Sequence, residues 1–159
     1  MCISSKQKGT ILENRIAELI TLGSDGKLTC YTPFADDDGI DLIIKEKGKF
    51  NTLYVQVKSR FVLNKGRFIQ DIGTNTFQSD RNSVIVFVFY DDVALDVETL
   101  WAIPSEDFKD KALLKAAGET HKESYRFSAG PNSDKDKWCS FKVEKSDLGQ
   151  WFIDHLKNT

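Results

Sequence analysis

Long hydrophobic runs are absent from this sequence of 159 residues, in which 40% of the residues are hydrophobic. The longest run, Val84–Tyr90, is far shorter than the ~20 apolar residues that a membrane-spanning helix needs. The first residues, Met1–Lys6, contain no apolar stretch of the kind found in a secretory signal. These absences argue against a membrane protein and lead us to expect no signal peptide.

Cysteine and net charge are also scarce. The chain has only 3 cysteines, Cys2, Cys30 and Cys139, which are widely spaced and odd in number. This pattern fits a reducing cytoplasm better than a disulfide framework. The formal net charge is −2, so no overall basic excess points to a polyanionic partner. The length fits one domain over residues 1–159, and the apolar content is too high for a disordered chain.

The small net charge hides two oppositely charged segments. Basic residues dominate between Lys45 and Arg67, whereas acidic residues dominate between Asp91 and Asp110. Such segregation can create a local field that attracts a polyanion. It can equally reflect two solvated surfaces, so charge alone does not decide between the two interpretations.

Hydrophobic periodicity predicts a mixed α/β fold. Helical spacing is present over residues 10–22, 105–117 and 147–157. Strand patterns are present over residues 28–34, 40–45, 52–59, 84–90, 100–103 and 138–143, with a short strand near Phe68. We expect residues 36–39 to form a turn and residues 119–137 to form a loop. The sum is a central mixed sheet flanked by helices.

One predicted hairpin concentrates polar residues on a single face. Alternation along strand 52–59 places Gln56 and Lys58 together, and a turn centred near Gly48 places Asp41 across from Gln56. This patch can be a solvated face with a weak Asp41–Lys58 ion pair. It can also be a functional site, because aspartate is poorly suited to a strand. Carboxylate and amide oxygens suit Mg²⁺ or Mn²⁺ as a cofactor, with Lys58 acting on a water or a phosphate.

The same residues resemble a known family. Gly39-Ile40-Asp41, followed by a hairpin and Gln56-Val57-Lys58, resembles the signature of the PD-(D/E)XK, or restriction-endonuclease-like, nucleases. Upstream, the segment from Lys8 to Glu13 is similar to the first helix of archaeal Holliday-junction resolvases. The resemblance covers residues 8–60. It implies a restriction-endonuclease-like core and metal-dependent hydrolysis of DNA in repair, recombination or restriction.

The resemblance also implies a role for each residue. Asp41 would be the main Mg²⁺ ligand, Glu13 would reach the metal directly or through water, and the Val57 carbonyl would add a ligand. Lys58 would position the attacking water. For Glu13 the alternative is an ordinary exposed helix acid. Asp38 is a further possible ligand, although a turn role suits it better.

Gln56 departs from the family pattern, in which most members have Glu or Asp. A Gln-x-Lys variant is similar to that of the Mrr-type restriction nucleases, so it does not exclude catalysis. A neutral amide binds a metal more weakly than a carboxylate. The alternative is therefore a catalytically inactive module that binds nucleic acid or a protein partner.

The basic segment would then contact the backbone of DNA, branched or otherwise structured DNA included. The predicted phosphate contacts are Lys45, Lys47, Lys49, Arg60, Lys65 and Arg67. No sequence-reading module is evident. Resolvase-like relatives suggest a homodimer.

Overall fold

The computed structural model describes residues 2–35 and 38–159. The helices are α1 (Ser5–Gly23), α2 (Ser105–Lys111) and α3 (Leu148–Lys157), and short 3₁₀ turns occupy Cys139–Phe141 and Lys145–Asp147. The strands are β1 (Leu28–Tyr31), β2 (Leu42–Glu46), β3 (Thr52–Arg60), β4 (Phe68–Gly73), β5 (Ser83–Asp91), β6 (Asp96–Pro104), β7 (Leu113–Lys115) and β8 (Ser124–Ala129).

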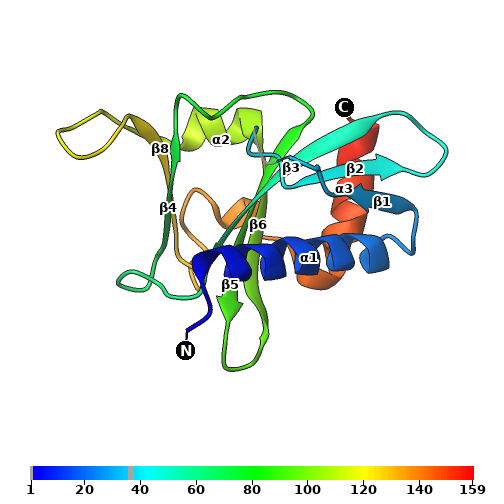
Figure 1. Ribbon diagram of the computed structural model, residues 1–159, viewed down its shortest axis with the longest axis horizontal. Helices are drawn as coiled ribbons and strands as arrows, with labels where there is room; N and C mark the ends of the chain where they lie inside the picture. The colour runs from blue at the N-terminus through cyan, green and yellow to red at the C-terminus, as the bar shows by residue number, and fades with distance from the viewer. Residues whose placement is uncertain (1, 36–37) are drawn as a thin grey trace.

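The main sheet has the order β1-β2-β3-β5-β6. β1, β2 and β3 pair antiparallel, β3 and β5 pair parallel, and β5 and β6 pair antiparallel. This confirms the mixed central sheet flanked by helices that the sequence predicts. A second sheet has the order β4-β8-β7, and the two sheets with α1 and α3 form successive layers (Figure 1).

One face of the main sheet is covered by α1 and α3. The buried α1 residues Leu12, Ile16 and Ile20 share a core with Val55 and Val57 of β3. Their spacing places all three on one stripe of the helix, as the 3.6-residue period requires. The first helix therefore lies directly over the strand that carries the Gln56-Val57-Lys58 motif.

The other face of the main sheet is an aromatic core. Phe87 of β5 stacks on Phe127 of β8, with the ring centroids 3.9 Å apart. Phe68, Trp101 and Phe108 complete the centre of the same buried cluster. This packing joins the second sheet and α2 to the face of the main sheet on which Gln56 and Lys58 lie.

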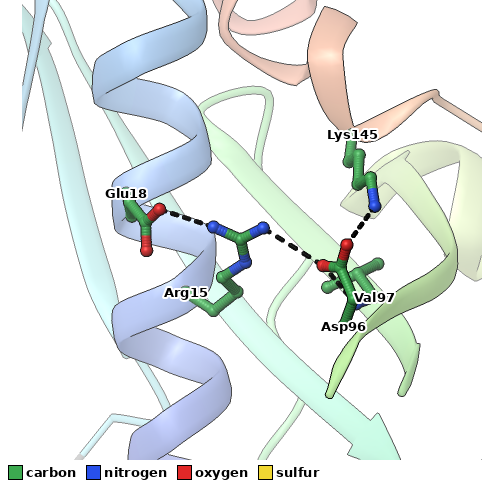
Figure 2. Close-up of polar contacts among 5 residues, drawn as sticks. All are labelled: Arg15, Glu18, Asp96, Val97 and Lys145. Carbon is green, nitrogen blue, oxygen red and sulfur yellow. Dashed lines mark hydrogen bonds and ion pairs between the residues drawn. The ribbon is translucent and has the colours of Figure 1, made fainter. Parts of the chain in front are cut away.

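An ion-pair network fixes the position of α1. Arg15 of α1 and Lys145 both contact the carboxylate of Asp96 at the start of β6 (Figure 2). These hydrogen bonds, first the one from Lys145 and then the one from Arg15, lower the pKa of Asp96 to about 2. The network ties three segments that are distant in the sequence to one carboxylate.

Three sequence predictions about local structure are wrong. The helix predicted over residues 105–117 ends at Lys111, because residues 113–115 pair with β8. The predicted loop 119–137 contains β8, and the predicted strand 138–143 is instead a 3₁₀ turn.

The predicted turn at 36–39 includes Asp36 and Asp37, which lie outside the described residues. Gly39 does adopt the left-handed conformation, with φ +68°. No helix in the described ranges is long and apolar enough to cross a membrane.

Candidate active site

Asp41 is held against the edge of β3 by two hydrogen bonds. Its backbone N–H donates to the Val55 carbonyl at 2.9 Å, and its Oδ2 accepts from the Val57 N–H at 2.6 Å. The second bond fixes the carboxylate beside the backbone that joins Gln56 to Lys58. A side chain oriented in this way is poorly explained as a solvated surface acid.

The β2–β3 ladder ends next to the predicted cross-strand pair. Leu42 pairs with Val55 as the last pair of the β2–β3 ladder, and the Asp41 N–H still donates to the Val55 carbonyl, so Asp41 lies just beyond the regular register, next to the Val55–Val57 backbone. Gln56 and Lys58 alternate with the buried Val55 and Val57, so both project from the opposite face of β3. Asp41, Gln56 and Lys58 therefore gather at one end of the hairpin.

Gly39 makes this arrangement possible in two ways. Its φ of +68° is a conformation that side-chain-bearing residues rarely adopt. A Cβ at this position would also lie 2.9 Å from Gln56 Nε2. Glycine therefore allows both the tight turn into Asp41 and the close approach of the Gln56 amide.

Glu13 lies on α1 next to the buried Leu12, on the border of the helix face that packs over β3. Its side chain is partly buried, and a Cβ at Gly9 would lie 3.8 Å from Glu13 Oε1. The carboxylate thus extends along the helix toward its N-terminus, as helical side chains do. Glu13 is therefore partly shielded on the helix surface, and its role as a ligand stays a prediction.

The donor set fits a magnesium ion in its chemistry. Asp41 offers a carboxylate, Gln56 an amide oxygen and Val57 a backbone carbonyl, and Mg²⁺ prefers oxygen ligands. No group of three or more His, Cys, Asp or Glu side chains suited to a metal occurs within residues 2–35 and 38–159. A metal at Asp41 would therefore rely on amide, carbonyl and water ligands in addition to carboxylates.

The hairpin lysines lie at the far end of β2 from Asp41. At about 3.4 Å per residue, Lys45 is about 14 Å from Asp41 along the strand. Lys45 Nζ donates to the Lys49 carbonyl at 2.9 Å, and Lys49 pairs with Glu46 at 2.8 Å. Lys47 lies in the turn, where its N–H donates to the Lys27 carbonyl. The structure thus separates these three lysines from the Asp41–Gln56 pair.

The basic residues at the end of β3 and after it differ in how free their side chains are to contact DNA. Arg67 donates to Ser128 Oγ and to the Ser128 carbonyl, both at 2.8 Å, so its guanidinium links β4 to β8. Lys65 is exposed in a tight turn with φ +49°. Arg60 ends β3 and lines a groove of about 360 Å³.

The Arg60 groove contains a cation that sequence reasoning missed. Arg126 of β8 lines the groove and binds Asp71 through both Nε and Nη2, at 2.7 and 2.8 Å. The Arg126 hydrogen bonds lower the pKa of Asp71. Alternation of Tyr125 and Phe127 with polar residues is the signal that could have revealed this strand.

The overall architecture is similar to that of a solved bacterial homing endonuclease, I-Ssp6803I. The match has a TM-score of 0.61 and 18% sequence identity, and it covers 98% of this chain and 94% of that chain. The chain therefore has an endonuclease-like fold. No protein-family model and no curated protein matches the sequence. At this level of identity the likeness concerns the fold alone.

Proposed function

We propose that this protein is a metal-dependent endonuclease that hydrolyses DNA phosphodiester bonds at the Asp41–Gln56–Lys58 end of the β2–β3 hairpin. The observation that carries the proposal is the 2.6 Å hydrogen bond from the Val57 N–H to Asp41 Oδ2. It holds a carboxylate against the backbone of the strand that carries Gln56 and Lys58. The likeness to the homing endonuclease supports DNA as the substrate.

Asp41, Gln56 and the Val57 carbonyl would hold Mg²⁺ or Mn²⁺, with Glu13 contributing from α1 directly or through water. When bound, the ion supplies Lewis-acid stabilisation of the phosphate oxygens. Asp41 is already oriented by the Val57 N–H, so little rearrangement is needed to present its oxygens. Lys58 orients the attacking water and offsets negative charge that develops on the phosphate.

The experiment is a cleavage assay on supercoiled plasmid and on branched DNA, with Mg²⁺, with Mn²⁺ and with EDTA. We expect nicking with either metal and none with EDTA. Asp41→Asn and Lys58→Ala should each reduce the rate by at least about 10²-fold, as losses of this electrostatic kind do. Cleavage that survives both substitutions would show that the site is elsewhere.

Gln56 favours a second candidate, a catalytically inactive module that binds DNA or a protein partner. A neutral amide contributes no charge to the metal, which weakens binding. Gln56→Glu separates the two candidates. If the wild type cleaves, the variant should need less Mg²⁺ for half-maximal cleavage. If the wild type binds DNA but never cleaves, and Gln56→Glu gains activity, the inactive module is the better description.

The biological setting belongs to the proposal as well. Repair, recombination and restriction all need such a nuclease, and the proposal covers all three. A homodimer would place two sites on opposite strands. Comparing nicked with linear product in the plasmid assay tests for paired cleavage.

A further inference from the structure

A cleft of about 440 Å³ opens directly beside Gln56. Its walls come from residues 38–40 before β2, from the Tyr54–Gln56 part of β3, and from residues 76–83 leading into β5. Figure 1 shows that last segment crossing above the sheet between β4 and β5. The cleft thus shares Gln56 with the proposed metal site.

The lining has an unusual chemistry for a nuclease surface. Carboxamides line it at Gln56, Gln78 and Asn82, and carboxylates line it at Asp38 and Asp80. None of the described residues that line it is Lys or Arg. A phosphate placed here would face two carboxylates and no cation. The cleft therefore suits a group that is neutral and rich in hydrogen-bond donors.

Asn82 lines the cleft and is fixed through its backbone. Its N–H donates to Asp80 Oδ1 at 2.7 Å, and its carbonyl accepts from the Tyr54 N–H at 2.8 Å. Its side-chain Oδ1 is buried, and within the described chain no donor reaches it. A buried acceptor without a donor is costly, so a ligand that turns the Asn82 side chain toward the cleft and donates to it would relieve that cost.

Aromatic and apolar groups complete the lining. Tyr54 is 38% exposed on the same face of β3 as Gln56, where its ring is available for stacking. Phe77 is held by edge contacts with Phe108 and Tyr125, with centroids 5.5 and 5.3 Å apart. Ile85 is almost fully buried at the base. The lining therefore offers apolar contact to a flat face and acceptors to a polar edge.

A nucleobase has this combination of a flat apolar face and a hydrogen-bonding edge. Carboxamides pair with base edges, and carboxylates accept from base amino groups. We propose that the cleft binds one nucleobase that has left the stack beside the scissile phosphate, which makes DNA with an unpaired nucleotide the preferred substrate. This inference rests on the proposed nuclease function. Unstacking a paired base costs a few kcal/mol, and an unpaired base costs less.

The first test compares three short duplexes that differ at one nucleotide: fully paired, with an unpaired adenine, and with an abasic residue. Single-turnover cleavage next to the unpaired adenine should be at least about tenfold faster than in the paired duplex. The abasic duplex should lose that gain, because it has flexibility but no base. Equal rates on the adenine and abasic duplexes would overturn the inference.

Binding without metal separates this inference from the proposed function. The affinity of each fluorescein-labelled duplex is measured by anisotropy in EDTA. Tighter binding of the unpaired-adenine duplex than of the abasic duplex supports the cleft even if no DNA is ever cut. Cleavage without any preference for the base would leave the nuclease standing and remove the base site.

Substitutions of cleft residues test whether the preference for an unpaired base arises in the cleft. Gln78→Ala and Tyr54→Ala alter exposed lining residues and should each remove most of the preference for the unpaired base, about tenfold where a stacked ring is removed. Tyr54→Phe keeps the ring and should retain the preference. Gln150→Ala, at an exposed position on α3, is the matched control. A preference that survives both Gln78→Ala and Tyr54→Ala would contradict the assignment.

Discussion

At the scale of single residues, Gly39 is the position on which the geometry of Asp41 and Gln56 depends. Gly48, in the turn of the same hairpin, has φ +78°, and a Cβ added there would have no atom within 4 Å. Both positions carry a similar backbone penalty for alanine, but only at Gly39 would the Cβ lie 2.9 Å from Gln56 Nε2. Comparing alanine variants at the two positions therefore distinguishes the effect of backbone strain from the effect of a displaced Gln56 amide.

We predict that Gly39→Ala and Gly48→Ala each lower the free energy of unfolding by about 1–2 kcal/mol, the cost of a left-handed alanine. Only Gly39→Ala should also reduce cleavage, because its methyl group displaces the Gln56 amide. Chemical denaturation and cleavage rates measured on both variants check this. Equal loss of activity in the two would remove Gly39 from the site.

A second pair of glycines tests the packing of α1 on α3. A Cβ at Gly149 would lie 2.3 Å from Gly23 C and from Ser24 N, whereas at Gly9 the nearest atom is 3.8 Å away. Both glycines are helical, so alanine improves helix propensity at each.

We predict opposite outcomes for the two substitutions. Gly149→Ala should destabilise the protein by about 1–3 kcal/mol, the usual cost of overpacking. Gly9→Ala should stabilise it by about 0.5–1 kcal/mol. Urea unfolding of both variants is the measurement, and a neutral Gly149→Ala would refute the close helix contact.

At the scale of elements, the Asp96 network predicts how stability depends on pH. The pKa of Asp96 is about 2 in the folded protein and near 3.8 without its partners. A lowered carboxyl pKa adds stability above the unfolded value, and that stability is lost as pH falls toward the folded value. Since about a third of the Asp96 side chain is exposed, we expect a contribution of only about 1 kcal/mol.

Asp96→Asn should therefore be less stable than the wild type at pH 5–7, since its amide lacks the charge that pairs with Arg15 and Lys145. The difference should shrink below about pH 4 and disappear near pH 2. Thermal unfolding of both proteins across this range measures it. A difference that stays constant with pH would show that the charge of Asp96 is not involved.

The sequence predicts elements well where periodicity is strong. Strand 84–90 is a continuous apolar run, and β5 is buried on both faces as expected. The helix predicted from residue 10 begins at Ser5 instead, because the Ser4–Gln7 capping box precedes the apolar stripe. The strand β7 is hidden in a helical pattern, since pairing with β8 overrides the local preference.

Some features of the candidate site could also be predicted from the sequence, and others could not. The β2–β3 register follows from a short hairpin, so the placement of Asp41 beside the strand of Gln56 could be predicted, but its hydrogen bond to the Val57 N–H could not. The cleft beside Gln56 could not, because it depends on where residues 76–83 lie relative to β3. Arg126 was missed for a different reason: the polar sequence on both sides of its strand is typical of a loop and masks the short alternation of Tyr125 and Phe127.

At the scale of the whole molecule, charge segregation predicts how DNA binding depends on salt. Replacing Lys45, Lys47 and Lys49 with Glu should weaken DNA affinity and make it less dependent on salt. The slope of log affinity against log salt concentration should fall by about 0.9 for each phosphate that the variant no longer neutralises. Replacing Lys109, Lys122 and Lys135 with Glu makes the same change in net charge elsewhere on the exposed surface.

Anisotropy titrations over a range of salt concentrations compare the two triple variants. The hairpin variant should show the lower slope, and the control variant should resemble the wild type. Identical slopes in all three proteins would place the DNA interface away from the hairpin. Such a result is compatible with phosphate contacts from Arg60 and Arg126 in the groove beside β4.

The central claim is that Asp41 and Gln56 form the metal site of a nuclease. The most direct measurement is an anomalous difference map from a crystal of the wild-type protein soaked in Mn²⁺. The account predicts one strong peak within bonding distance of the Asp41 carboxylate, the Gln56 amide oxygen and the Val57 carbonyl. A strong peak elsewhere, or no peak at Asp41 in a protein that cleaves DNA with Mn²⁺, would contradict it.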